Sequence, residues 1–244
     1  MIKLLTPLLA LAVACVTGLA HSQTPVAAPV TVPMTAPVAA AVPVQAPGPA
    51  GAKAVQAKVA VCIGCHGIPG YQASFPEVYR VPMISGQNAK YIVAALNAYK
   101  AGDRKHPTMR GISSALSDQD MNDIGAYYES HGREGAKAVA ATASREPNAK
   151  VAALLQKAAC ASCHGANFSK PIDPSYPKIA GQHSDYLFVA LKAYKIENNA
   201  TSGRNNAVMS SIARQFSNDE LKALSKYVSS LDGELQTRPQ AKFR

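Results

Sequence analysis

A six-residue pattern occurs twice in this chain of 244 residues, as CIGCHG at 62–67 and as CASCHG at 160–165. Each copy has two cysteines separated by two residues, with a histidine directly after the second cysteine. The similarity extends into two further pairs of segments: VPMISGQNAKYIVAALNAYK (81–100) with YPKIAGQHSDYLFVALKAYK (176–195), and MRGISSALSDQDMNDIGAYY (109–128) with MSSIARQFSNDELKALSKYV (209–228). Because the matching segments follow one another in the same order, the chain is a tandem duplication.

The duplication predicts two domains of similar fold. Between the two halves the offset changes from 98 at the cysteine pattern to 95 and then to 100, and we expect these changes to fall in loops. The domains are predicted at 51–133 and 147–244, with an alanine-rich linker at 134–146. Each half is long enough to bury a small core of its own.

Both domains are predicted to be all-α. Segments 88–101 and 183–197 have apolar residues at helical spacing, and the first of them ends at Gly102. The sequences S-x-x-D at Ser117 and S-x-x-E at Ser217 are capping boxes, which we expect to begin the last helix of each domain. No segment shows the alternation of apolar and polar residues that indicates a strand.

The first 50 residues are expected to lie outside the two domains. Residues 1–22 combine one lysine, a short apolar run and small residues near the end, which is the pattern of a secretory signal peptide. Residues 23–50 are rich in Pro, Ala and Val, and their closely spaced prolines favour polyproline II, so we expect a disordered spacer. The protein is therefore predicted to be exported to the periplasm. Lipidation of Cys15, which would tether the N-terminus to a membrane, stays open as the alternative to cleavage.

The chain is basic, with 25 Lys and Arg against 15 Asp and Glu and a formal net charge of +10. It has no dense Lys/Arg stripe with interleaved aromatic residues, so nucleic-acid binding is not predicted. A basic surface suits an acidic redox partner protein or an anionic membrane, although a merely solvated surface has the same composition.

The cysteine pattern itself indicates the chemistry. A zinc site needs four ligands, and two C-x-x-C pairs could supply them, but here each pair is followed by a histidine inside its own repeat. A thioredoxin-type pair belongs in a βαβ context, and a disulfide across two residues would be strained. C-x-x-C-H is the attachment signature of c-type haem. We therefore predict two covalently bound haem c groups, attached at Cys62 and Cys65 and at Cys160 and Cys163, with His66 and His164 as axial ligands of the iron.

The sixth iron position is predicted to be filled by methionine. Met209 is the single methionine of the second domain, and Met109 stands at the corresponding place in the first. Met83 and Met121 align with residues other than methionine, so we interpret them as packing residues. Methionine is a soft, neutral ligand that raises the reduction potential, as a carrier of electrons requires.

The remaining histidines and the repeated tyrosines are interpreted as structural. His106 aligns with Asn206, His183 aligns with an asparagine, and His131 has no counterpart, so all three are predicted to be surface polar residues. Three pairs of tyrosines recur in the two halves and are predicted to pack on the haem or between helices: Tyr91/Tyr186, Tyr99/Tyr194 and Tyr127/Tyr227.

Across residues 51–233 the chain resembles the dihaem cytochromes c4, which are tandem class I c-type cytochromes. The resemblance implies two globular domains whose haems face each other across the domain interface. It also implies a periplasmic electron carrier that serves terminal oxidases or other reductases, with a donor such as a cytochrome bc1-type complex. By the same resemblance, Pro82 and Pro177 should lie near the proximal histidines, where a main-chain carbonyl orients the imidazole. Gln87 and Gln182 should lie near the haem edge.

Two alternatives to a free carrier remain open at this point. The chain could be the cytochrome subunit of a periplasmic dehydrogenase complex, because the haem chemistry would be the same. It could also be a haem enzyme, a peroxidase or a thiosulfate-oxidising cytochrome, acting at one site with a displaceable ligand. The matched Met109 and Met209 argue against an enzyme.

Overall fold

The computed structural model describes residues 49–131 and 138–239. The predicted signal peptide at 1–22 and nearly all of the predicted spacer at 23–50 lie outside the described residues, as does the start of the predicted linker. Among the described residues, no helix combines the length and the apolar character needed to span a membrane.

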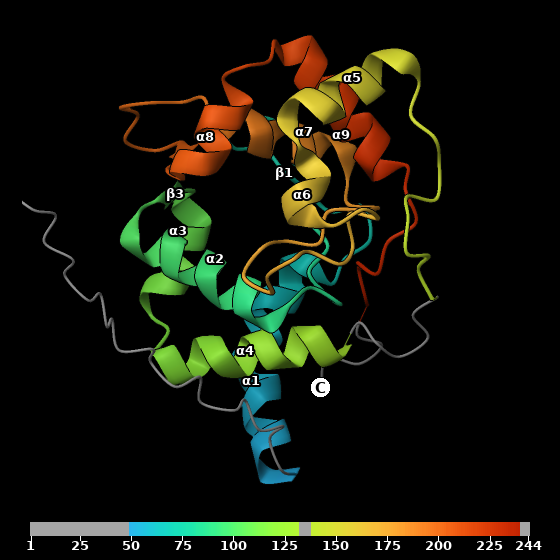
Figure 1. The fold of residues 1–244 in the computed structure, drawn as a ribbon. Coiled ribbons are helices and arrows are strands. Elements are labelled where there is room, and N and C mark those ends of the chain that lie inside the picture. The colour runs from blue at the N-terminus through green and yellow to red at the C-terminus, as the bar shows by residue number, and fades with distance from the viewer. Residues whose placement is uncertain (1–48, 132–137, 240–244) are drawn as a thin grey trace, which may run out of the picture. The chain divides into compact units, whose positions relative to one another are not determined.

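Both halves of the chain are built from helices, which confirms the all-α prediction (Figure 1). The first half contains α1 (Pro49–His66), α2 (Ala89–Ala101), α3 (Pro107–Ser114) and α4 (Asp118–His131). The second half contains α5 (Ala149–Ala158), α6 (Cys160–His164), α7 (Ser184–Ala193), α8 (Ala207–Ala213) and α9 (Asn218–Ser229). The helices follow the same order in both halves, with α5 and α6 together in the place of α1.

One helix is shorter than predicted. α2 ends where expected, because Gly102 takes the left-handed conformation with φ 87° and its N–H bonds to the carbonyl of Tyr99. The sequence predicts a helix at 183–197, but α7 ends at Ala193, with Tyr194 as its C-cap. Glu197 stands where the first domain has Gly102, so the second domain lacks the glycine that ends α2 in the first.

The last helix of each domain begins at a capping box, as predicted. Ser217 Oγ accepts a hydrogen bond from the Glu220 N–H at 3.2 Å, and the Glu220 carboxylate accepts one from the Ser217 N–H at 2.7 Å. Ser117 and Asp120 form the same pair of bonds in the first domain, at 3.2 and 3.0 Å. Each box satisfies main-chain N–H groups that have no partner within the helix.

Within residues 49–131 and 138–239 the structure adds four strands of two residues each, which are too short to give an alternating pattern in the sequence. β1 (Gln72–Ala73) and β2 (Tyr79–Arg80) pair within the first domain. β3 (Arg104–Lys105) and β4 (Gly203–Arg204) pair antiparallel across the two domains, with Arg104 opposite Arg204. The β3–β4 pair therefore joins equivalent loops of the repeat.

Each domain has its own core, which lies where α1, α2 and α4 meet in the first domain and where α5, α7 and α9 meet in the second. Met121 on α4 has none of its surface exposed and packs with apolar residues of α1 and α2, which confirms its interpretation as a packing residue. Leu221 occupies the same place in the second domain and is 1 % exposed. Burial of these apolar side chains holds the helices that carry the cysteine pattern.

Lys58 on α1 joins that helix to α4 through two carboxylates. Its Nζ lies 2.7 Å from Asp120 Oδ1 and 2.6 Å from Asp123 Oδ2. The bonds from Lys58 lower the pKa of both carboxyl groups below the ordinary value of 3.8. The same bonds raise the pKa of Lys58 above 10.5.

Replacing Lys58 by methionine is expected to lower the melting temperature of the holoprotein at pH 7. The carboxylates contribute stability that is fully present above pH 3.8 and is lost as the pH falls through their lowered pKa values, so the difference between variant and wild type should shrink in strong acid. Thermal unfolding at several pH values between 2 and 7 measures this. Lys222→Met, an exposed lysine of α9, is the matched control. A difference that stays constant down to the lowest pH would contradict the assignment.

Candidate functional site

The two C-x-x-C-H patterns lie at equivalent places in the two domains. Cys62, Cys65 and His66 form the last turn of the long helix α1. In the second domain the helix is broken by Ala159, which has φ 48°, so the second pattern forms a separate short helix, α6. The four cysteines of the patterns are half-buried, and none of them is paired in a disulfide.

A proline carbonyl orients each histidine of the patterns. His66 Nδ1 lies 2.8 Å from the oxygen of Pro82, and His164 Nδ1 lies 3.0 Å from the oxygen of Pro177. A carbonyl only accepts, so Nδ1 carries the proton and donates, and Nε2 keeps a free lone pair. Burial lowers the pKa of both histidines below 6.5, so both rings are neutral at pH 7. A neutral imidazole with a fixed tautomer is the form that binds a metal ion.

The two predicted methionines lie at the start of equivalent helices, α3 and α8. The N-cap side chain of each helix accepts a hydrogen bond from the main-chain N–H of the methionine. The bond from Met109 to His106 Nδ1 is 3.3 Å long, and the bond from Met209 to Asn206 Oδ1 is 2.9 Å long. His106 is therefore not the surface polar residue predicted from the sequence: it is a helix cap, and its Nε2 lies 3.0 Å from the hydroxyl of Tyr79.

All eight predicted site residues line one cavity of about 1340 Å³. They are Cys62, Cys65, His66, Met109, Cys160, Cys163, His164 and Met209. Small-molecule pockets usually measure about 300–1,000 Å³, so this cavity has room for more than one ligand. Its wall is mainly apolar and includes residues of both domains.

Two arginines that the sequence analysis did not single out also line the cavity. Arg104 Nη2 donates to the Tyr91 hydroxyl at 3.1 Å, and Arg204 Nη2 donates to the Tyr186 hydroxyl at 3.0 Å. Each guanidinium group also lies over the rings of two tyrosines, with centroid distances between 5.2 and 5.7 Å. No carboxylate of the described residues forms an ion pair with either one. The offset of 100 that pairs Met109 with Met209 also pairs these arginines, so the repeat already carried this signal.

These residues fit two haem c groups. Paired thiols suit the porphyrin vinyl groups, and the oriented imidazoles and the methionine sulfurs suit the iron. The apolar wall suits the macrocycle, and cations without a carboxylate partner suit the propionates.

Two helical domains, each with a C-x-x-C-H helix on an apolar cavity, define a c-type cytochrome with two haem domains. The cytochrome c family model matches residues 50–132 and 148–232. Cytochrome c4 of Stutzerimonas stutzeri is 33% identical over 191 residues, which cover 74% of this chain and 89% of that protein. The chain therefore belongs to the cytochrome c family, and within it to the dihaem cytochromes c4. It accordingly carries two covalently bound haem c groups and acts in electron transport.

Two further comparisons bear on the fold and on partners. The crystal structure of reduced recombinant cytochrome c4 from Pseudomonas stutzeri superposes with a TM-score of 0.52 at 29% identity, covering 74% of this chain and 98% of that one. A thiosulfate dehydrogenase electron acceptor of Stutzerimonas stutzeri (strain A1501) is 29% identical over 171 residues, which cover 68% of this chain and 76% of that protein.

Proposed function

We propose that this protein is a periplasmic dihaem electron carrier that takes electrons from a respiratory-chain donor, such as a cytochrome bc1-type complex, and delivers them to a terminal oxidase or reductase. Cys62, Cys65, Cys160 and Cys163 attach the haems in this proposal. The axial ligands are His66 with Met109 in the first domain and His164 with Met209 in the second. The observation that carries the proposal is the matched pair of sites, each with an oriented histidine and a capped methionine on one cavity.

The geometry suits electron transfer better than catalysis. A haem iron supplies a one-electron ferric/ferrous couple. The carbonyls of Pro82 and Pro177 hold the imidazole rings in place, so the ligands need not move when the charge of the site changes. The caps at His106 and Asn206 fix the main chain of the two methionines in the same way. With both axial positions filled by the protein, no position is left for a substrate, and we propose that the protein is not an enzyme.

The N-terminal residues and the charge support a role outside the cytoplasm. A signal peptide at 1–22 would export the chain to the compartment where c-type haem is attached. The excess of basic over acidic residues would attract an acidic partner protein and would speed its association at low ionic strength.

A second candidate function is the acceptor of electrons from a periplasmic dehydrogenase. The likeness to a thiosulfate dehydrogenase electron acceptor favours it, since that relative aligns with 68% of this chain. Stable co-purification with a catalytic subunit would separate this role from that of a freely diffusing carrier.

The first test is the ligation of the purified holoprotein. We expect the near-infrared charge-transfer band from methionine to ferric haem, normalised to total haem, to correspond to two His/Met haems per chain. We also expect no binding of carbon monoxide by the reduced protein and no peroxide turnover, because no axial position is open. One His/Met haem out of two, together with ligand binding at the other, would favour a haem enzyme instead.

A further inference from the structure

Two buried glutamines cross the interface between the domains at equivalent positions of the repeat. Gln87 belongs to the first domain and is 3 % exposed, and Gln182 belongs to the second and is 4 % exposed. Each side chain is held by the N–H of the following residue, which donates to its Oε1 at 3.0 Å. Each side chain is therefore fixed before it reaches the other domain.

Each glutamine forms two hydrogen bonds with the main chain of one residue in the opposite domain. Gln182 Oε1 accepts from the Met83 N–H at 3.1 Å, and its Nε2 donates to the Met83 carbonyl at 2.9 Å. Gln87 Oε1 accepts from the Lys178 N–H at 2.9 Å, and its Nε2 donates to the Lys178 carbonyl at 3.0 Å. The two contacts are equivalent under the duplication, because Met83 aligns with Lys178.

These two residues, Met83 and Lys178, directly follow the prolines whose carbonyls orient the histidines. The N–H of Met83 and the carbonyl of Pro82 belong to one peptide group, and that carbonyl accepts from His66 Nδ1 at 2.8 Å. The N–H of Lys178 and the carbonyl of Pro177 likewise share a peptide group, and that carbonyl accepts from His164 at 3.0 Å. A continuous hydrogen-bond chain thus runs from the glutamine of one domain, through a single peptide group, to the histidine of the other.

Such a chain has an electronic consequence as well as a mechanical one. A peptide whose N–H is engaged by an acceptor is polarised, so its carbonyl becomes a better acceptor. A stronger acceptor on Nδ1 makes a metal-bound imidazole more basic. The more basic ligand favours the ferric state and lowers the reduction potential.

We propose that Gln87 and Gln182 are positioning residues that act in trans, each lowering the reduction potential of the haem in the opposite domain. This inference rests on the proposed ligation by His66 and His164. It makes the contact between the domains a determinant of both potentials, so that separating the domains would raise them.

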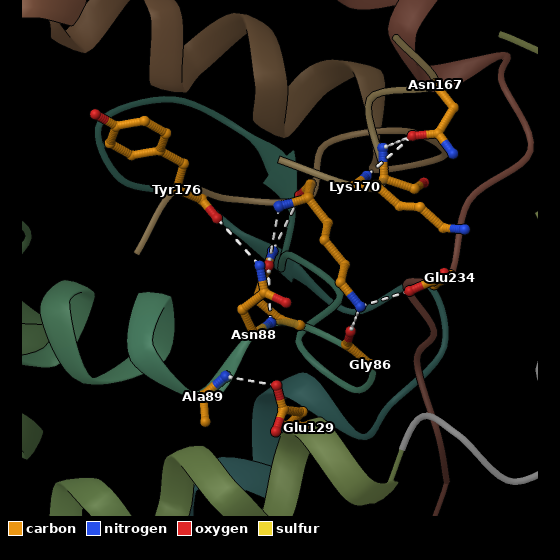
Figure 2. A network of polar contacts seen from close by, with 11 residues as sticks. Gly86, Asn88, Ala89, Glu129, Asn167, Lys170, Tyr176 and Glu234 are labelled. Carbon is orange, nitrogen blue, oxygen red and sulfur yellow. Dashed lines mark hydrogen bonds and ion pairs between the residues drawn. The ribbon is translucent and has the colours of Figure 1, made fainter. Parts of the chain in front are cut away.

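The neighbouring contacts of the interface supply a matched control. Asn88 Nδ2 also crosses to the second domain, where it donates to the carbonyl of Tyr176 at 3.3 Å (Figure 2). That carbonyl belongs to the peptide group before the one that binds His164. Asn88 therefore has a side-chain amide that reaches the opposite domain, as the glutamines have, but it takes no part in the hydrogen-bond chain to the histidine. Lys178 Nζ donates to the carbonyl of Gly86 in the first domain and is paired with Glu234 of its own domain (Figure 2). The bond to Gly86 would still join the domains in a glutamine variant.

The test is a redox titration of the holoprotein that resolves two one-electron waves, assigned to domains with single Met109 and Met209 variants. Methionine is close to glutamine in size but cannot form these hydrogen bonds. Gln182→Met is therefore expected to raise the reduction potential of the haem in the first domain and to leave that of the other haem unchanged. Gln87→Met should do the reverse, and Asn88→Ala should move neither. We expect the ferrous-to-ferric ratio of the affected haem, at a fixed potential, to rise by about tenfold or less. Loss of an outer partner of a metal-bound histidine typically changes metal affinity or activity by about 10–100-fold, and the glutamine acts one bond further out.

A second variant and a second readout guard against a general loss of structure. Gln182→Glu keeps an oxygen that accepts from the Met83 N–H and should not raise the wave of the first domain. The ¹⁵N shift of His66 Nδ1 should respond to Gln182→Met and not to Gln87→Met. This inference alone would be overturned if the methionine variants, in a protein with two His/Met haems, left both reduction potentials unchanged. It would also be overturned if each variant shifted the potential of the haem in its own domain. A wild-type protein without two His/Met haems would overturn the proposed function and the inference with it.

Discussion

Replacing Met209 by alanine is expected to lower the reduction potential of one haem by a large part of the ~0.8 V range over which axial ligands tune haem iron. Thioether sulfur is a soft and neutral ligand that favours ferrous iron, so its loss stabilises the ferric state. Met109→Ala should have the same effect on the other haem. Each variant should also lose one of the two methionine charge-transfer bands and gain a site that binds carbon monoxide.

The structure supplies a control for this prediction. Met121 is buried and contacts the core of the first domain, and Leu221 fills its place in the second. Met121→Leu should therefore leave both potentials unchanged and cost less than about 1.5 kcal/mol of stability. Two unshifted waves and two full bands in both alanine variants would contradict the proposed methionine ligands. Redox titration and near-infrared absorption of the same samples decide the matter.

The helices could be predicted from the sequence, and the candidate site residues could be proposed from it, because each depends on local chemistry that the duplication repeats. The capping boxes at Ser117 and Ser217 depend only on residues three positions apart. Each half contains one C-x-x-C-H pattern. Met109 and Met209 align with each other, whereas Met83 and Met121 align with other residue types, so the alignment alone separates the two pairs of methionines. The structure brings all eight predicted residues to one cavity.

Features that depend on contact between the two domains could not be predicted from the sequence. The pairing of β3 with β4 and the reach of Gln87 to Lys178 require both halves to be in place. From the resemblance, Gln87 was expected near the haem edge. It does line the cavity, but nothing in its own domain revealed the partner that it binds. The sequence does not predict a cap at His106, because histidine is not among the preferred N-cap residues, although Asn206 at the matched position is one of them.

Gly165→Ala is expected to destabilise the second domain strongly. Gly165 directly follows His164 and has φ 83° and ψ 157°, a conformation that is essentially restricted to glycine. A residue held in such a region costs about 1–3 kcal/mol. A Cβ atom would also lie 2.0 Å from the carbonyl oxygen of Lys170, so the main chain must move as well. Because the displaced segment adjoins His164, we expect the wave of the second haem to shift along with the loss of stability.

Gly64→Ala provides the contrast within the other cysteine pattern. A Cβ atom there meets nothing within 4 Å, and the second domain already has Ser162 at the equivalent place. Since alanine is favoured over glycine in a helix interior, this variant should be neutral or more stable by up to about 1 kcal/mol. Denaturant unfolding of both holoproteins, with redox titration alongside, measures the two effects. Equal stabilities for the two variants would show that the conformation of Gly165 imposes no constraint on the turn that follows His164.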